Sequence, residues 1–143
     1  MSEPTLGTTT VMQVGLIVRD IEAKARVWSK ILGLPMPKIM VTDTYERAQT
    51  EYQGQRSEAR ARLAFFHLGQ VDLELIEPIG EPNTWKDQLD AYGDSLHHIA
   101  FFIKGMPEKT TYLSAEGLPL IQRGEYPGGR YAYFDSVAQL GRF

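Results

Sequence analysis

The chain has 143 residues, of which 43% are hydrophobic and 23% charged, and its formal net charge is −3. This composition predicts a single globular domain with a sizeable core, and the mixing of lysine and arginine with acids argues against a nucleic-acid surface. The chain has no cysteine, which excludes disulfides, thiolate nucleophiles and cysteine-ligated metal sites. No apolar run approaches the roughly 20 residues of a membrane helix, and we expect a cytoplasmic protein.

Hydrophobic spacing predicts the elements of the first half of the chain. After a polar lead at 1–9, strands are expected at 11–18, within 38–53, at 62–68 and at 71–77. A helix is expected after Asp20, a suitable N-cap, because apolar residues recur at helical spacing at Ile21, Ala25, Trp28 and Leu32. The helix should end at Gly33.

An internal repeat organises the whole chain. Residues 11–36 reappear in altered form at 96–120, so that Gln13 aligns with His98. A second pair matches 61–69 with 129–136. Repeats of this length indicate two copies of one supersecondary unit that share a core.

The repeat divides the single domain, 1–143, into three parts. Module one spans about 10–78, residues 79–94 form a linker with a short amphipathic helix (Trp85, Leu89 and Tyr92), and module two spans 95–143. Module two should contain a strand at 96–103, a helix from Pro107 to Gly117, and strands near 119–123 and 130–135. By the repeat, the copy of strand 71–77 begins at Phe143, so the last strand of module two is expected to be missing or cut short.

Three polar residues on predicted strands form a candidate site. Alternate residues of a strand face opposite sides, and the pseudo-twofold relation of the modules brings Gln13 and His98 together, with Glu74 reaching the same hollow. His97 is expected to face the other way. A fourth donor, a carboxylate equivalent to Glu74, would fall two or three positions after Phe143.

Imidazole, amide and carboxylate donors suit a divalent zinc, nickel, cobalt, manganese or iron ion and leave positions open for a substrate. Four aromatic residues share the strand parity that would line a pocket, although aromatic residues on strands are also ordinary packing: Phe65, His67, Tyr131 and Tyr133. A basic group, Arg56, Arg60, Arg62 and Lys38, could attract an anionic substrate. We favour the alternative that these four form a solvated hairpin.

Three stretches, VGLIVRDIEAKARVWSKILGLP, LAFFHLGQVDLELIEP and GDSLHHIAFFIKG, resemble the vicinal oxygen chelate superfamily, which includes glyoxalase I, methylmalonyl-CoA epimerase, extradiol dioxygenases and bleomycin-resistance proteins. The resemblance covers Val11 to Phe143. It implies an α+β fold in which two βαβββ modules form an open, half-barrel mixed sheet with helices on the outer face. It also implies an internal metal ion and a homodimer.

Carried over position by position, the resemblance makes Gln13, Glu74 and His98 the metal ligands and Glu74 a candidate catalytic base. Gln13 departs from the family, which often has histidine there, and an amide oxygen binds transition metals more weakly than imidazole does. The family's fourth ligand is not in this chain. The second carboxylate of an epimerase is also missing, because Arg60 to Leu63 occupy its neighbourhood and the nearest glutamate is Glu58.

Two functions remain open at this point. One is a metal-dependent lyase or isomerase that transfers a proton next to a carbonyl of a small anionic metabolite. The other is a metal-free protein of the same fold that binds or sequesters a small molecule, as the resistance branch does. Glu74 and His98 favour the first function, and Gln13 with the missing fourth ligand favours the second.

Overall fold

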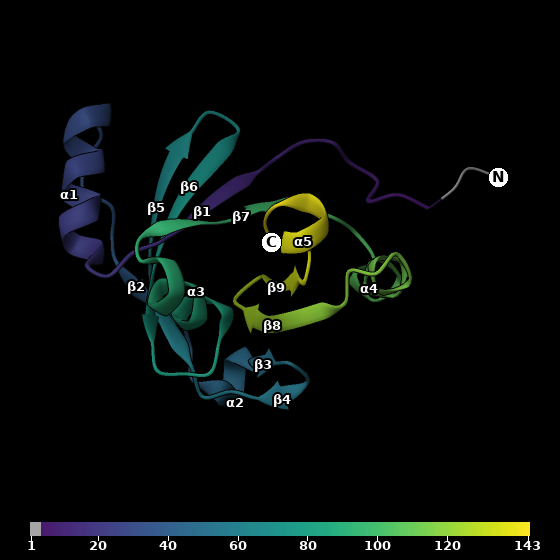
Figure 1. The fold of residues 1–143 in the computed structure, drawn as a ribbon. Helices are drawn as coiled ribbons and strands as arrows, with labels where there is room; N and C mark the ends of the chain where they lie inside the picture. Colours follow the sequence, from purple (N-terminus) through teal and green to yellow (C-terminus); the bar gives the residue numbers. More distant parts are fainter. Residues whose placement is uncertain (1–3) are drawn as a thin grey trace.

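The computed structural model describes residues 4–143 and contains two open sheets, which confirms the predicted α+β class (Figure 1). The five-stranded sheet has the order β2 (Met40–Val41), β5 (Arg60–Leu68), β6 (Val71–Ile79), β1 (Gln13–Ile17) and β7 (Ser95–Ala100). The four-stranded sheet has the order β4 (Gln55–Arg56), β3 (Glu51–Tyr52), β8 (Leu120–Tyr126) and β9 (Gly129–Phe134). Of the predicted polar lead, residues 4–9 form no helix or strand, and residues 1–3 lie outside the described part.

The first strands of the two modules lie side by side in one sheet. β1 runs parallel to β6 and antiparallel to β7, and β5 and β6 form a long antiparallel hairpin. Gly15, in the middle of β1, is paired with Glu74 on one side and with His98 on the other. The strands that carry the three candidate site residues are therefore neighbours, as the repeat predicted.

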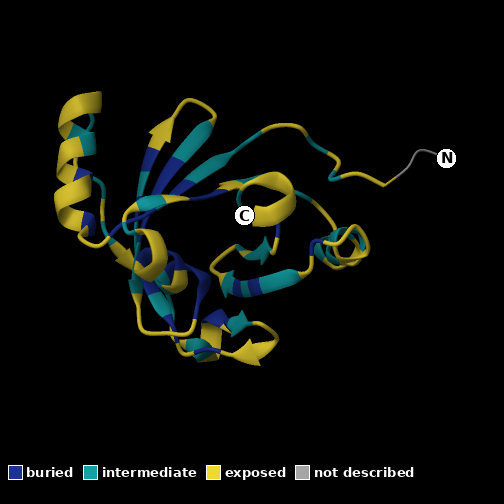
Figure 2. Ribbon diagram, in the orientation of Figure 1, coloured by how far each residue is buried: buried dark blue, intermediate teal, exposed yellow. Residues whose placement is uncertain are grey.

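Helix α1 (Ile21–Leu32) has the predicted bounds. Asp20 is its N-cap and accepts a hydrogen bond from the Ala23 N–H, and Gly33 ends it with the left-handed backbone that glycine adopts without a Cβ penalty. The helix buries Ile21 and Ala25 against the sheet and exposes its outer side (Figure 2).

The five-stranded sheet is covered on both faces. On the outer face, α1 packs onto a cluster that contains Val18, Ala64, Phe66, Leu73 and Leu75. On the inner face, Trp85 and Leu89 of α3 (Thr84–Tyr92) pack onto Ile17, Ala61 and Ile76. The linker helix therefore lies inside the half-barrel at one end, an exception to the expectation that helices cover only the outer face.

The stretch 38–53, predicted to hold one strand, contains two short ones. The two-residue strand β2 is followed by a short helix, α2 (Tyr45–Ala48), and then by β3, which forms a hairpin with β4 in the predicted charged turn. The hairpin leaves module one and pairs with β8 of module two, where the Glu51 carboxylate lies 2.7 Å from the Arg123 guanidinium. A pairing between distant segments leaves no local signal in hydrophobic spacing.

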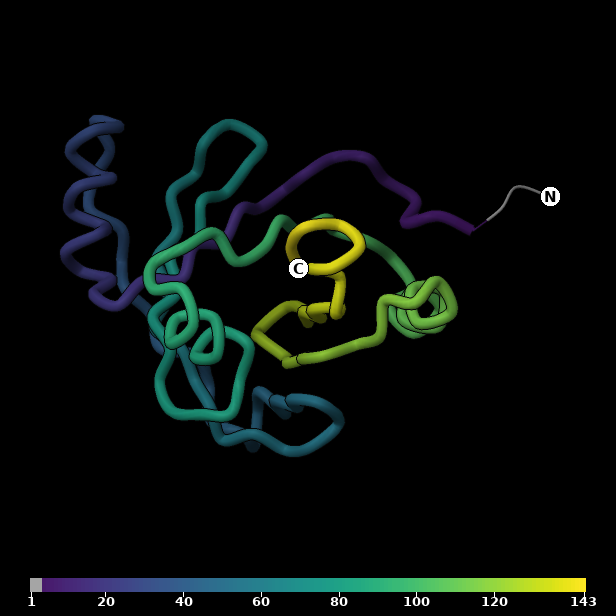
Figure 3. The backbone as a smooth tube through the Cα atoms, in the orientation of Figure 1, coloured from purple at the N-terminus to yellow at the C-terminus, as the bar shows by residue number. Residues whose placement is uncertain are grey.

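Module two contains α4 (Met106–Ala115) between β7 and β8, and a short α5 (Val137–Leu140) after β9. Pro107 lies in the first turn of α4, as predicted, and no residue of this helix is buried. The segment before β1 runs across the molecule to α4, where the Lys109 ammonium donates to the Thr5 carbonyl (Figure 3). No helix within residues 4–143 has the length and apolar character needed to span a bilayer.

Candidate functional site

Gln13, Glu74 and His98 converge on the inner face of the five-stranded sheet. His98 Nε2 lies 2.8 Å from Gln13 Oε1 and 3.5 Å from Glu74 Oε1. The His98 side chain is 2% exposed and that of Glu74 is 10% exposed. The structure thus brings together all three residues that the sequence placed in one hollow, each from a different strand.

Gly15 makes this geometry possible. A Cβ atom at Gly15 would lie 2.2 Å from His98 Cε1 and 2.5 Å from His98 Nδ1, far inside van der Waals contact. The imidazole therefore lies flat over the glycine backbone, and any side chain there would displace it. Glycine is needed here because the imidazole lies so close to the backbone, and not for its conformational freedom, since the Gly15 backbone is that of an ordinary strand.

Glu74 is a buried carboxyl group without a basic partner. Among the described residues, no lysine or arginine lies within ion-pair distance of it, and the His98 imidazole lies 3.5 Å away. Burial, with a smaller contribution from Asp72, raises the pKa of Glu74 to about 8. Burial lowers the pKa of His98 to about 4. Near neutral pH the metal-free site therefore holds a neutral imidazole and a largely protonated carboxyl group, and a cation that binds there would displace that proton.

His97 does not face away from the site, contrary to the prediction. A β-bulge shifts the pairing of β1 with β7, so that Gly15 pairs with His98 and Leu16 pairs with Leu96. His97 is the extra residue of the bulge, which breaks the alternation of faces. Its buried ring lies edge-on to His98, with ring centroids 5.1 Å apart.

Tyr131 and Tyr133 line the site from the four-stranded sheet. The Trp85 indole N–H donates to Tyr133 Oη at 3.2 Å, and the Gln122 amide donates to Tyr131 Oη at 3.1 Å. Burial, and secondarily the Glu74 charge, raises the pKa of the Tyr133 hydroxyl well above 10. Burial raises the pKa of Tyr131 to about 12. Both hydroxyls are therefore protonated and can donate hydrogen bonds at neutral pH.

The other two predicted pocket residues have different surroundings. Phe65 pairs with Glu74 across β5 and β6, and shares its face of the sheet. His67 lies near the turn of the same hairpin, its side chain is 80% exposed, and its Nδ1 is 2.7 Å from the Asp72 carboxylate. His67 therefore lies outside the site. Strand parity predicted its face of the sheet correctly, but parity does not indicate how far along the strand a residue lies from the site.

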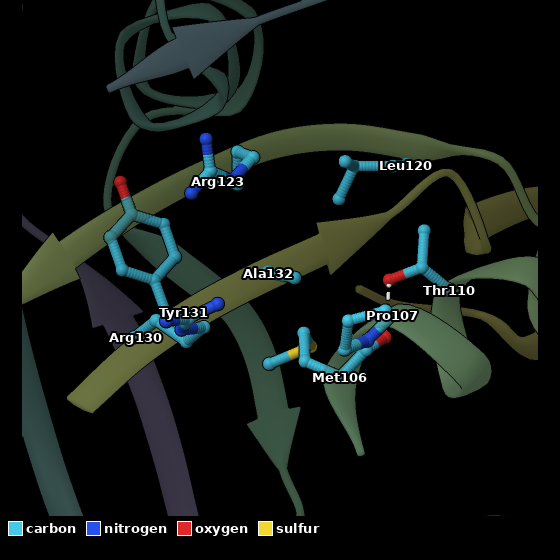
Figure 4. Close-up of a pocket in the computed structure, with 8 residues that line it drawn as sticks. All are labelled: Met106, Pro107, Thr110, Leu120, Arg123, Arg130, Tyr131 and Ala132. Atoms are coloured by element: carbon cyan, nitrogen blue, oxygen red, sulfur yellow. Dashed lines mark hydrogen bonds between the residues drawn. The ribbon is translucent and has the colours of Figure 1, made fainter. Parts of the chain in front are cut away.

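A cavity of about 310 Å³ lies between α4 and the four-stranded sheet (Figure 4). Tyr131 borders this cavity, and the rest of the wall is formed by Met106, Pro107, Thr110, Leu120, Arg123, Arg130 and Ala132. Both arginines pair with Glu125. The cavity is therefore mostly apolar, with neutralised charges at its edge.

The three arginines of the basic group considered for anion binding are engaged in structural contacts. Arg56 pairs with Glu58, and Arg62 pairs with Glu22 and Glu77. Arg60 donates to the Thr42 carbonyl. These contacts favour the interpretation as a partly solvated hairpin.

Gln122 and Trp85 were not among the predicted site residues. The Gln122 amide oxygen accepts from the Thr84 N–H at 2.8 Å while its NH₂ donates to Tyr131. Gln122 therefore links the first residue of α3 to Tyr131 of the four-stranded sheet. No sequence pattern distinguishes Gln122 from any other polar residue of a strand. Trp85 was predicted only as an apolar residue of the linker helix, not as a residue of the site.

The donor set fits a divalent ion, although it is not an all-histidine-and-carboxylate site. Within residues 4–143, no group of three histidine, cysteine or acidic side chains converges as a metal centre. The third donor here is the amide oxygen of Gln13, beside one imidazole nitrogen and one carboxylate oxygen. Mixed nitrogen and oxygen donors of this kind suit ions of intermediate hardness, such as zinc or manganese.

Comparison with known families identifies the fold. The model of the Glyoxalase/Bleomycin resistance protein/Dioxygenase superfamily matches residues 12–134. The chain belongs to this superfamily. The vicinal oxygen chelate fold expected from the sequence is thereby confirmed. Members of this superfamily commonly bind divalent metals.

Individual relatives agree with the assignment. The chain is 31% identical over 110 residues to the uncharacterized protein YqjC of Bacillus subtilis (strain 168), covering 77% of this chain and 69% of YqjC. Several solved structures share the fold, including the following three. The hypothetical protein BH1468 from Bacillus halodurans C-125 is 20% identical with a TM-score of 0.56, covering 87% of this chain and 92% of that one.

The other two are methylmalonyl-CoA epimerases. The enzyme from Mycobacterium tuberculosis is 16% identical with a TM-score of 0.54, covering 94% of this chain and 91% of that one. An epimerase in complex with methylmalonyl-CoA and NH₄⁺ is 19% identical with a TM-score of 0.63, covering 92% and 88%. At these identities the likeness shows the shared fold.

Proposed function

We propose that the protein is a metal-dependent lyase or isomerase that transfers a proton next to a carbonyl group of a small anionic metabolite. The observation that carries the proposal is the buried convergence of Gln13 Oε1, Glu74 Oε1 and His98 Nε2 on one face of the sheet, where no lysine or arginine of the described chain lies within ion-pair distance of Glu74. Such an uncompensated carboxyl group is costly unless a cation or a proton accompanies it.

In this proposal Gln13, Glu74 and His98 hold the divalent ion. When bound, the ion would supply Lewis-acid polarisation of a substrate oxygen. Glu74 also carries the proton-transfer chemistry in this proposal, because it is the carboxyl group of the site and would be ionised near neutral pH once an ion is bound beside it. The hydroxyls of Tyr131 and Tyr133 are placed to orient an oxygen of the substrate.

The fold relatives support an acyl substrate of modest size. One methylmalonyl-CoA epimerase of this fold is in complex with methylmalonyl-CoA. We infer for this chain the broader class, a small molecule with a carbonyl beside an ionised group. The carboxylate that the sequence comparison expected near Arg60 to Leu63 of an epimerase is not replaced by a neighbouring acid, since Glu58 pairs with Arg56.

A metal-free binding protein is the second candidate. It is favoured by the Gln13 amide, a weaker ligand than imidazole, and by the aromatic wall of Trp85, Tyr131 and Tyr133, in which adjacent ring centroids lie 5.1 to 6.4 Å apart. Such a wall suits a flat apolar ligand without any chemical step.

Metal content separates the two functions. We expect about one divalent ion per chain when the protein is purified without chelators and measured by elemental mass spectrometry. His98→Gln should lose the ion, whereas His67→Gln, which changes an exposed histidine outside the site, should retain it. A wild-type protein that takes up no Zn²⁺, Ni²⁺, Co²⁺, Mn²⁺ or Fe²⁺ but binds an aromatic ligand would establish the second candidate instead.

A fourth donor can be engineered from the register of β7. The Ile99 N–H donates to the Phe143 carbonyl at 3.2 Å, as the Val18 N–H donates to Ile76 in the parallel pairing of β1 with β6. Ile99 is the repeat equivalent of Val14, which lies four residues before Val18, so Phe143 corresponds to the residue four positions before Ile76, Asp72. The second position after Phe143 then corresponds to Glu74. We expect a chain lengthened by alanine and glutamate to bind Zn²⁺ more tightly than one lengthened by alanine and glutamine. Equal affinities would contradict the pseudo-twofold design of the site.

We further propose a homodimer. The helix α1 and the edge strand β2 each expose apolar side chains, namely Val27, Ile31, Met40 and Val41. Edge strands and apolar surface of this kind are commonly covered by a second subunit. Sedimentation analysis should give twice the chain mass, and Ile31→Glu should reduce it to one chain. A wild-type protein that sediments as a monomer would contradict the proposal.

A further inference from the structure

A chain of buried hydrogen-bonding groups runs from α3 into the candidate site. Thr84 Oγ1 lies 3.0 Å from His97 Nε2, and His97 Nδ1 lies 2.9 Å from His98 Nδ1. At the far end, His98 Nε2 lies 2.8 Å from Gln13 Oε1. Both imidazole rings and the threonine are at least 97% buried, so water does not take the place of any of these contacts.

The contact between the two Nδ1 atoms couples the tautomers of the rings. A neutral imidazole carries a proton on one nitrogen and a lone pair on the other. A hydrogen bond between two Nδ1 atoms requires a proton on one of them only. Two neutral rings joined by this contact must therefore be opposite tautomers.

Two arrangements satisfy this requirement. In the first, Thr84 donates to His97, His97 Nδ1–H donates to His98, and His98 Nε2–H donates to the Gln13 oxygen, which fits the observed acceptor. In the second, the two bonds of His97 are reversed, so that His98 Nδ1–H donates to His97 and His97 Nε2–H donates to Thr84. The Gln13 oxygen, which can only accept, has no hydrogen bond from His98 in this arrangement. His98 then holds its proton on Nδ1 and presents a lone pair at Nε2, toward Gln13 and Glu74.

We propose that His97 is a positioning residue that sets the tautomer of His98, and that loading the site with a divalent ion exchanges the tautomers of both rings. The proposal rests on the metal site proposed above. An ion held by His98 Nε2 needs the lone pair of the second arrangement, so the proton leaves Nε2 for the Nδ1 side. Each ring keeps one proton: that of His98 is on Nδ1 and donates to His97 Nδ1, and that of His97 is on Nε2 and donates to Thr84 Oγ1, so the charge of neither ring changes.

His97 is fixed in place for this role. Its ring packs edge-on to Tyr133 with centroids 4.9 Å apart, and it lies 5.1 Å from the Phe143 ring. The bulge in β7 places it beside His98 rather than on the opposite face. A histidine partner differs from the carboxylate or carbonyl that usually orients a metal-binding histidine, because it can either donate or accept.

The test is nitrogen NMR of the protein with ¹⁵N-labelled histidine, because two-bond correlations report which ring nitrogen carries the proton. In the metal-free protein we expect a proton on Nδ1 of His97 and on Nε2 of His98. After addition of Zn²⁺, we expect both to exchange, with the His97 proton moving to Nε2. Equal tautomers in the metal-free protein, or a His97 tautomer that Zn²⁺ does not change, would overturn the proposal.

Failure of the proposed function is distinguishable from failure of this proposal. If the protein takes up no metal, the proposed enzyme is wrong, and the metal-free spectrum still decides whether the rings are an opposed pair. The variants give a second readout. His97→Asn keeps a group near Nδ1 that can donate or accept, so we expect Zn²⁺ affinity within about threefold of the wild type.

His97→Phe keeps the packing of a ring but has no polar atom, and we expect about 10- to 100-fold weaker Zn²⁺ binding by titration calorimetry. The exposed residue His67, changed to Asn, is the control and should leave the affinity unaltered. Equal loss in the Asn and Phe variants would assign His97 a packing role only and overturn the proposal. If the Phe variant does not fold, retention in the Asn variant and the wild-type spectra decide.

Discussion

Replacement of Glu74 by glutamine should change how the stability of the metal-free protein depends on pH. Burial raises the pKa of Glu74 from 4.5 to about 8. Between these two values the folded chain keeps a proton on this carboxyl that the unfolded chain has released. The folded state binds more protons, so the free energy of unfolding falls as pH rises through this window. Glutamine does not titrate, so Glu74→Gln removes this dependence.

The expected magnitude follows from the interval between the two pKa values. Each pH unit corresponds to about 1.4 kcal/mol, so the interval from 4.5 to about 8 amounts to about 5 kcal/mol. This is comparable to the whole stability of a marginal domain, about 5 to 15 kcal/mol. The lowered pKa of His98 acts in the opposite sense, since it adds stability as pH rises from about 4 to 6.5. That contribution is common to both proteins and cancels in the difference.

The assay is urea unfolding of the wild type and of Glu74→Gln in the presence of a chelator, from about pH 5 to about pH 8. The two proteins should have similar free energies of unfolding near pH 5. Near pH 8 the variant should be more stable by several kcal/mol. Glu58→Gln, which changes an exposed glutamate paired with Arg56, is the control and should follow the wild type at every pH. If the curves of the wild type and Glu74→Gln are parallel, the reasoning from burial is wrong.

Three further predictions concern the same site. Gly15→Ala places a methyl group against the His98 ring, so it should abolish metal uptake and cost about 1 to 3 kcal/mol in chemical denaturation. Gly129→Ala contacts only the mobile end of an exposed tyrosine and should do neither, and equal behaviour of the two variants would argue against the close packing at Gly15. Gln13→His should strengthen Zn²⁺ and Ni²⁺ binding in titration calorimetry, because imidazole is the better ligand, and weaker binding would place residue 13 outside the ligand set. Metal uptake near neutral pH should release about one proton, from Glu74, as measured in buffers of different ionisation enthalpy. Release of no proton would mean that Glu74 does not bind the ion.

Local patterns were sufficient to predict most of the fold. The caps of α1 at Asp20 and Gly33 and the proline in the first turn of α4 are signals contained within a few residues, and the structure confirms all three. The repeat predicted that Gln13 and His98 would meet, because duplicated modules pair their equivalent strands.

The remaining features depend on contacts between distant segments. The bulge in β7 breaks the alternation of side chains between the two faces, and this is why His97 lies in the site. No residue type in β7 indicates a bulge. The exposure of His67 depends on how far the β5–β6 hairpin projects beyond the site, which alternation does not measure. Gln122 acquires its role only when α3 and the four-stranded sheet come together.

The β3–β4 hairpin has a consequence for how a ligand reaches the hollow. This piece of module one is hydrogen-bonded into the sheet of module two, so the pairing of β3 with β8 links the two modules in addition to the pairing of β1 with β7. A rigid-body opening of one module away from the other would have to break the hydrogen bonds between β3 and β8. A ligand would therefore have to enter through smaller local movements that leave the pairing of β3 with β8 intact.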